Sequence, residues 1–218
     1  MAKIILDKDG WRRINVSRGK INFSQRNNKI MPLVTCQVTS MVMGLSYIGW
    51  KFPEGKYEQP EDNLKAYFME QGKNPEIHAD LAEYTNRWLG KAAVSFSTNR
   101  MTPQIVNEIV EGRPIIMSGQ FPGFPTRRTQ PLGHIVCLVG CEWQPANAEN
   151  PTASPDFFII DDPYGDTLND WKGSGNDVRL DAETFYSWMK PEKDQGVKWG
   201  HFFKTPSDAV DWVPPSNK

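Results

Sequence analysis

The sequence predicts an α+β fold, in which a group of helices comes first along the chain and an antiparallel sheet follows. Three observations carry this prediction. Apolar residues recur at helical spacing from residue 36 to about residue 111, they form short strand-like runs from residue 114 onward, and no composition shift marks a linker between the two regions. The 218 residues can bury a substantial core, so we expect residues 1–218 to form one domain.

The first predicted helix begins at Cys36 and is anchored in the core. Its apolar residues follow the i, i+3, i+4 and i+7 spacing of a buried stripe: Val38, Met41, Val42, Leu45 and Ile48. Gly49 suits the C-terminal cap of this helix. The amides and dipole at a helix start favour a thiolate over a thiol, as a cysteine nucleophile requires. A small core residue is the alternative interpretation of Cys36, and this stretch alone does not decide between the two.

Capping signals locate the other helices. We expect helices over residues 61–71, 75–90 and 103–111. Asn74-Pro75 and Thr102-Pro103 are cap-plus-proline starts for the second and third of these, and Asp181 caps a last helix that ends before Pro191.

Strands are predicted from short apolar runs bounded by turn residues, at residues 3–6, 11–16, 93–97, 114–117, 134–139, 157–161 and 199–204. The first two form an N-terminal hairpin within residues 1–20, with Asp9-Gly10 as its turn. Residues 118–132, rich in Gly and Pro, are expected to be a long functional loop, and residues 214–218 a flexible tail.

Composition limits the classes of partner. The net charge is −1 with no charged block, so we expect no nucleic-acid partner, and no stretch is long and apolar enough to span a membrane. The N-terminus has too short an apolar run for a secretory signal. We therefore expect synthesis in the cytoplasm unless a signal precedes this sequence. The oligomeric state cannot be predicted.

Three cysteines argue against a disulfide framework. Cys137 and Cys141 lie four residues apart on a predicted strand, about 13 Å at strand rise, which is too far for a bridge. A zinc site at His134, Cys137 and Cys141 is disfavoured, because His134 and Cys137 lie on opposite faces of that strand. The acid-rich residues 161–181 lack the spacing of a calcium loop, so a solvated turn is the favoured interpretation there and a structural calcium the alternative.

Three residues in chain order could form a catalytic constellation. Cys36 lies at a helix start, His134 at a strand start and Asp162 at the end of the next strand. A thiol nucleophile needs a base beside it, and the base needs a group that fixes its tautomer. Neighbouring antiparallel strands can place His134 beside Asp162. The other two histidines, His78 and His201, are expected to be structural or solvated.

These residues resemble a known family. Cys36 with Thr39-Ser40-Met41, Gly133-His134-Ile135-Val136, and Asp162-Pro163-Tyr164-Gly165 are similar to papain-like cysteine peptidases, in particular to the group related to the bacteriocin-processing (double-glycine) peptidases. This group includes bacterial and phage proteins and some cell-wall lysins. The resemblance covers about residue 25 to about residue 189. It implies a papain-like fold with no cofactor.

The resemblance also implies roles for single residues. Cys36 is the nucleophile, His134 the general base and acid, and Asp162 orients the histidine. Gln25 is the upstream oxyanion donor, and Asn28 is the alternative candidate for that role. Asp161 precedes Asp162 and is expected to point to the opposite face of the strand.

Three further residues are candidates for binding the substrate: Gln37, Arg127 and Tyr164. Many relatives have Gly-Pro directly after the cysteine, whereas this chain has Gln37-Val38. Gln37 could therefore replace the oxyanion donor or narrow the pocket. Arg127, with Arg128, could bind an acidic group of the substrate, although such a pair is more often a solvated part of a loop.

The function implied is hydrolysis of a peptide bond. The chain lacks the membrane spans of a transporter-bound leader peptidase, and its Asp-Pro-Tyr-Gly turn resembles phage and wall-associated relatives, so we expect peptidoglycan peptides as the substrate. A chain made in the cytoplasm would reach this substrate after release to the cell wall. Three alternatives stay open: a protein-processing peptidase, a non-catalytic peptide- or wall-binding module on the same fold, and acyl or amide transfer by the same triad chemistry.

Overall fold

Eight strands form one antiparallel sheet in the computed structural model, which describes residues 5–7, 9–17, 23–123, 131–149, 154–189 and 197–214. The strands are β1 (Ile5–Leu6), β2 (Arg12–Asn15), β3 (Val94–Met101), β4 (Ile115–Phe121), β5 (Leu132–Trp143), β6 (Phe157–Asp161), β7 (Val178–Asp181) and β8 (Val197–Phe203). Their order is β1-β2-β5-β4-β8-β3, and β6 pairs with both β5 and β7. The long strand β5 is therefore the centre of the sheet.

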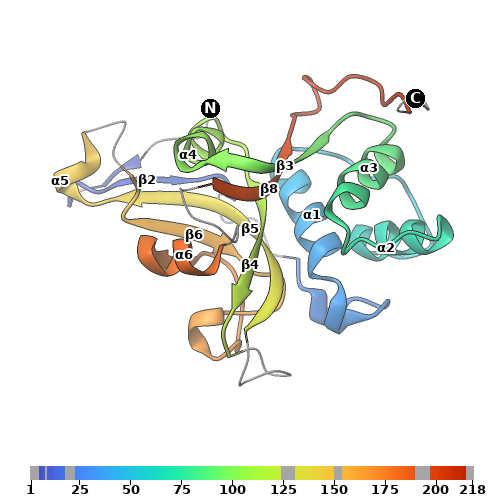
Figure 1. Cartoon of the computed structure of the whole chain (residues 1–218), viewed down its shortest axis with the longest axis horizontal. Coiled ribbons are helices and arrows are strands. Elements are labelled where there is room, and N and C mark those ends of the chain that lie inside the picture. The colour runs from blue at the N-terminus through green and yellow to red at the C-terminus, as the bar shows by residue number, and fades with distance from the viewer. Residues whose placement is uncertain are drawn as a thin grey trace.

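Six α-helices lie in the described residues: α1 (Cys36–Tyr47), α2 (Pro60–Glu70), α3 (His78–Leu89), α4 (Thr102–Val110), α5 (Pro145–Ala148) and α6 (Ala182–Trp188). The α1, α2 and α3 helices gather on one side of the molecule, and most of the sheet occupies the other side (Figure 1). Within the helical group α1 packs on α2, and it also packs on β5 and β4 of the sheet. The predicted α+β fold, with its N-terminal helices on an antiparallel sheet, is confirmed.

The hydrophobic core explains why α1 is held so firmly. Every residue of this helix except Ser46 is buried, because one face meets the sheet and the others meet α2 and the surrounding loops. Gly44 lets the helix approach the sheet closely, since a Cβ there would lie only 2.6 Å from the ring of Phe203. Tight contact of this kind fixes the position of the helix start as well as its middle.

Several predicted boundaries differ from the structure. The helix expected from residue 75 begins at His78, because Asn74 instead forms a turn in which its Oδ1 accepts the Glu76 N–H at 3.0 Å. The predicted loop 118–132 is shorter: residues up to Phe121 continue β4, pairing with β5 as far as Leu132. The β7 strand was missed, and β3 extends four residues beyond its predicted end at residue 97.

The predicted N-terminal hairpin is present as β1 and β2, with Gly10 at a φ of 79° in its turn. Of the predicted tail 214–218, only Pro214 belongs to the described residues. Cys137 and Cys141 are free and buried. Among the helices that the structure describes, none is long and apolar enough to cross a membrane.

Candidate active site

Cys36 is the first residue of α1, and its side chain is only 8% exposed. Three hydrogen bonds fix this end of the helix. The amide group of Asn28 donates to Thr35 Oγ1 at 2.9 Å and to Thr39 Oγ1 at 3.0 Å, which ties the preceding segment to the first turn. Ser40 Oγ donates to the carbonyl oxygen of Ile135 at 3.1 Å, which ties α1 to the strand that carries His134.

His134 lies near the start of β5, opposite Gly119 of β4. Its Nε2 lies 2.8 Å from Oδ1 of Asp162, and both side chains are buried. Asp162 directly follows β6, and its Oδ1 also accepts the backbone N–H of Tyr164 at 2.8 Å. The backbone N–H of Tyr164 therefore fixes the carboxylate, and the carboxylate fixes the imidazole.

The Cys36 side chain is hydrogen-bonded to the imidazole of His134. Because Nε2 is engaged by Asp162, Nδ1 is the nitrogen that faces the thiol. Burial by itself lowers the pKa of His134, but the charge and hydrogen bond of Asp162, helped by Cys36, outweigh burial and raise the pKa to about 10. At neutral pH the imidazole is thus charged, and it is suited to stabilise a thiolate beside it.

Asp161 has a separate role, as the strand alternation predicted. Its Oδ2 accepts the hydroxyl of Tyr47 at 2.5 Å, and its Oδ1 accepts the backbone N–H of Asp177 at 2.7 Å. Burial raises the pKa of Asp161 to about 6 despite these hydrogen bonds. The two adjacent carboxylates therefore serve different parts of the structure, and only Asp162 meets His134.

Two aromatic rings enclose the imidazole. Phe121 and Trp171 each meet the His134 ring edge to face, with centroid distances of 5.1 and 5.4 Å. Both aromatic side chains are buried, so they exclude water from the hydrogen bond between His134 and Asp162 and strengthen it. Neither residue is predicted from the sequence: Phe121 falls within the expected loop, and no pattern marks Trp171, which adopts a φ of 61°.

The sequence model of the Peptidase_C39 like family matches residues 20–190, most of the chain and all of the site described above. The chain belongs to the Peptidase_C39 like family. This membership supports a cysteine peptidase, and it confirms the resemblance to papain-like cysteine peptidases. The family match does not bear on the likeness to wall lysins, which stays a prediction.

The fold agrees with this assignment. A crystal structure of a C39-like peptidase from Bacillus anthracis superimposes with a TM-score of 0.53 over 88% of this chain and 98% of that chain, at 18% sequence identity. At this identity the similarity shows the fold alone. No protein of curated function is similar enough to the chain to count as a match.

The two candidate oxyanion donors of this C39-like chain differ in how their amides are used. Asn28 spends both N–H groups on the threonines at the start of α1, so it is a structural residue. Gln25 is buried in a 3₁₀ turn (Gln25–Asn27), and its Nε2 donates to the carbonyl oxygen of Pro32 at 2.9 Å. One N–H of Gln25 thus holds the segment before Cys36, and the other forms no hydrogen bond within the described residues.

The predicted substrate-binding residues are only partly brought to the site. Gln37 follows Cys36 and is buried, and its Oε1 has no hydrogen-bond partner among the described residues. Tyr164 is buried, its backbone N–H donates to Asp162, and the guanidinium of Arg26 lies over its ring at 4.4 Å from the centroid, so the ring is packed within the protein. Arg127 lies outside the described residues.

The alternative metal sites gain no support from the described residues, where no group of three or more His, Cys, Asp or Glu side chains could hold an ion. Two carboxylates of the acid-rich segment, those of Asp166 and Asp181, cap the helical turns that follow them. His78 and His201 contact each other at 3.1 Å in a cluster with Phe96. Burial and the neighbouring His78 lower the pKa of His201 to about 3, so this pair is neutral and structural.

We expect iodoacetamide at neutral pH to alkylate Cys36 well before the other two thiols. Cys137 and Cys141 are fully buried, and burial raises the pKa of both, so each is protonated and shielded. Peptide mapping of the partly labelled native protein measures the order. Faster labelling of Cys137 or Cys141 would contradict the assignment of Cys36 as the reactive thiol.

Proposed function

We propose that this chain is a cysteine endopeptidase with Cys36 as the nucleophile, His134 as the general base and acid, and Asp162 as the group that orients the imidazole. The observation that carries the proposal is the continuous buried contact from the Cys36 side chain through His134 to Asp162. A charged imidazole held between a helix-start thiol and a carboxylate is the arrangement that cysteine nucleophiles use.

The chemistry follows from these positions. The Cys36 thiolate attacks the carbonyl carbon of the scissile peptide bond, and negative charge develops on the carbonyl oxygen. The backbone N–H of Cys36 and the side-chain amide of Gln25 would stabilise this oxyanion. The His134 imidazolium then gives its proton to the leaving amine as the C–N bond breaks, which leaves a thioester between the substrate acyl group and Cys36.

Hydrolysis of the thioester uses the same groups in reverse. Neutral His134 removes a proton from water, whose oxygen attacks the acyl carbon, and the C–S bond breaks to release a carboxylic acid and the Cys36 thiolate. Asp162 keeps Nε2 of the imidazole occupied throughout, so that Nδ1 always faces the reacting atoms.

Gln25→Ala is expected to lower kcat by roughly 10²- to 10³-fold with little change in KM, because an oxyanion donor acts mainly in the transition state. Gln37→Ala is the matched comparison, since Gln37 is the other buried glutamine at the site, and we expect it to lower kcat less than tenfold. Steady-state kinetics on a fluorogenic peptide measures both. The reverse order of effects would make Gln37 the oxyanion donor.

For the substrate we propose the peptide stems or cross-links of bacterial peptidoglycan, supported by the likeness of Asp162-Pro163-Tyr164-Gly165 to wall-associated relatives. The test is the fall in turbidity of purified cell walls of several chemotypes, with Cys36→Ala as the inactive control and mass spectrometry of the released fragments. New amino termini released from wall peptides by the active protein alone would support the proposal. Walls left intact while an unfolded protein such as casein is cleaved would refute it.

A second substrate class is favoured by a specific surface. Met31, Leu33 and Val34, directly before the Thr35 cap of α1, are 54%, 59% and 40% exposed. Their segment is held by Asp62, whose carboxylate accepts the N–H groups of Lys29 and Ile30 at 2.9 and 3.0 Å. An exposed apolar surface directly before the helix that carries Cys36 favours a protein substrate with a bulky apolar residue near the scissile bond. Leu33→Ser would then raise KM for casein.

A further inference from the structure

Arg26 follows the candidate oxyanion donor Gln25 in the 3₁₀ turn Gln25–Asn27, and it has no part in the chemistry proposed above. Its guanidinium is held at two places. It lies over the Tyr164 ring, and its Nη2 donates a hydrogen bond to the carbonyl oxygen of Trp171. A planar guanidinium can stack on a ring with its face and donate from its edge at the same time. Arg26 therefore joins the turn that carries Gln25 to the loop that carries Trp171.

The chain leaves room for this contact at Gly165. A Cβ at residue 165 would lie 2.6 Å from the Trp171 carbonyl oxygen and 2.9 Å from Nη2 of Arg26, so a larger residue would push the two apart. A second link lies close by, because the backbone N–H of Gln25 donates to the carbonyl oxygen of Pro163 at 2.8 Å. The turn and the segment after β6 are thus joined at two points, one through the backbone and one through Arg26.

The loop that carries Trp171 needs support, because its backbone is strained. Asp170 and Trp171 adopt φ values of 51° and 61°, the left-handed conformation that residues with a Cβ disfavour. Within the loop, the Trp171 N–H donates to the carbonyl oxygen of Asp166 at 2.8 Å. From outside the loop, Arg26 binds the Trp171 carbonyl. Strained conformations persist only where neighbouring groups hold them, so loss of Arg26 should let the loop relax.

The Trp171 ring connects this loop to the chemistry. It meets the His134 imidazole edge to face at a centroid distance of 5.4 Å, and both side chains are buried. Relaxation of the loop would withdraw the ring and let water reach the hydrogen bond between His134 and Asp162. Among the described residues, no hydrogen bond or ring contact joins Arg26 to His134 itself. An influence of Arg26 on the imidazole would therefore pass through Trp171.

We propose that Arg26 is a positioning residue of the active site, which holds the Trp171 carbonyl and thereby keeps the Trp171 ring against the His134 imidazole. The inference rests on the function proposed above, because it concerns how the same site keeps its histidine shielded from water. It assigns Arg26 no contact with the substrate.

Arg26→Gln should lower the pKa of His134 by about one pH unit or more. Water entering the site would weaken both burial, which lowers this pKa, and the influence of Asp162, which raises it. Because the net result of the two is a rise to about 10, the pKa should return toward its ordinary value. Loss of a nearby positive charge would by itself raise the pKa, so a fall separates positioning from simple electrostatics. An NMR titration of the His134 imidazole measures it without a peptide substrate, and an unchanged or raised pKa would refute the proposal.

The same variant should lower kcat on a fluorogenic peptide by roughly tenfold at neutral pH and move the alkaline limb to lower pH, with little change in KM. Arg12→Gln is the matched control. The Arg12 guanidinium also lies over a ring, at 4.7 Å from the centroid of Trp143, but Trp143 is nine residues along β5 from His134, roughly 30 Å at strand rise. This control should behave like wild type. A raised KM with an unmoved limb in Arg26→Gln would make Arg26 a substrate-binding residue and overturn the proposal.

Trp171→Leu tests the route, because it removes the ring but keeps the backbone carbonyl. It should itself lower the pKa of His134, and Arg26→Gln added to it should lower the pKa little further. Equal effects of Arg26→Gln with and without the Trp171 ring would show that Arg26 acts by another route, which would refute the proposal. If the titrations follow these expectations and the wild-type chain cleaves no peptide, the peptidase function is wrong and the positioning role of Arg26 is supported.

Discussion

Cys36→Ala is expected to abolish peptide-bond hydrolysis, lowering kcat by roughly 10⁴-fold or more, because removal of the nucleophile of a triad eliminates the covalent route entirely. The substitution removes one sulfur at the start of a helix that is held by Asn28, Ser40 and the core, so the fold should persist. Single-turnover assays on a fluorogenic peptide measure the loss, and circular dichroism confirms the fold.

Cys141→Ala is the matched control for this substitution. Cys141 is also a buried free thiol, but it lies in β5 away from His134, so we expect activity close to wild type and a loss of roughly 1 kcal/mol of unfolding free energy for the small cavity. Activity retained by Cys36→Ala would refute the proposed mechanism. If Cys36→Ala lowered the turbidity of cell walls but cleaved no peptide, the result would show only that the wall assay does not depend on Cys36.

Asp162→Asn is expected to lower kcat by roughly 10²- to 10⁴-fold while leaving the structure of the site intact. The neutral amide can still contact Nε2 of His134, but it no longer stabilises the charged imidazole. Since the charge of Asp162 is the main influence that raises the His134 pKa to about 10, the variant should have a lower His134 pKa.

This change has a signature in the pH dependence. A thiolate–imidazolium pair loses activity as the pH rises through the histidine pKa, so the alkaline limb of the wild-type profile should lie near pH 10. In Asp162→Asn that limb should move to lower pH, because the imidazolium is less stabilised. An alkaline limb that stays in place would show that Asp162 does not control the charge of His134.

Asp161→Asn provides the control for this variant. Asp161 is the adjacent buried carboxylate, and its hydrogen bonds run to Tyr47 and Asp177 instead of His134. We expect it to reduce the free energy of unfolding by roughly 1–3 kcal/mol, with kcat lowered less than tenfold and the alkaline limb unmoved. Comparable kinetic effects of the two substitutions would indicate a general electrostatic or packing effect rather than a specific role for Asp162.

Local sequence signals were sufficient for the parts of the site that depend on neighbours along the chain. The stripe from Val38 to Leu45 fixed the helix and therefore the place of Cys36 in its first turn. The two-residue alternation of a strand separated Asp161 from Asp162, and the Asp181 side chain accepts the Thr184 N–H at 2.8 Å as the cap prediction required. Each of these features involves residues close in sequence.

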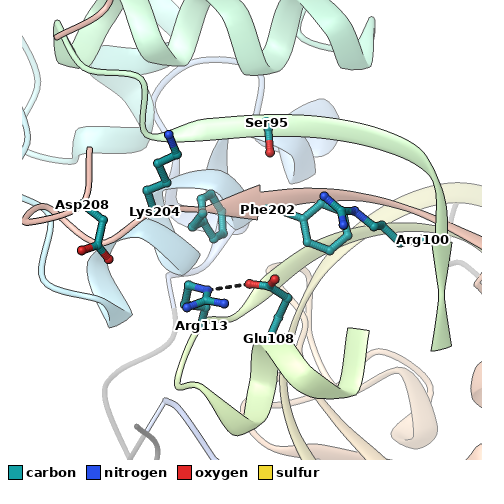
Figure 2. Close-up of a pocket in the computed structure, with 8 residues that line it drawn as sticks. Ser95, Arg100, Glu108, Arg113, Phe202, Lys204 and Asp208 are labelled. Carbon is teal, nitrogen blue, oxygen red and sulfur yellow. Dashed lines mark hydrogen bonds and ion pairs between the residues drawn. The ribbon is translucent and has the colours of Figure 1, made fainter. Parts of the chain in front are cut away.

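Other features could be known only from the tertiary structure, because they join residues far apart in the chain. Phe121 and Trp171 enclose His134 from segments 50 residues apart, and neither carries a local signal of that role. The choice of Gln25 over Asn28 also needed coordinates, since it depends on which amide hydrogens are already bound. The hollow lined by Arg100, Glu108 and Lys204 also depends on the tertiary structure, because it requires β3, β8 and α4 to meet (Figure 2).

The sequence by itself therefore determined the α+β fold and the helix that presents Cys36, and its resemblance to a known family picked out Cys36, His134 and Asp162. Periodicity and capping are short-range consequences of backbone geometry, so they can be read from the order of the residues. The tertiary structure alone decided which polar groups are satisfied and how the His134 imidazole is charged and shielded. Burial and electrostatic interactions depend on distances between remote segments, and packing sets those distances.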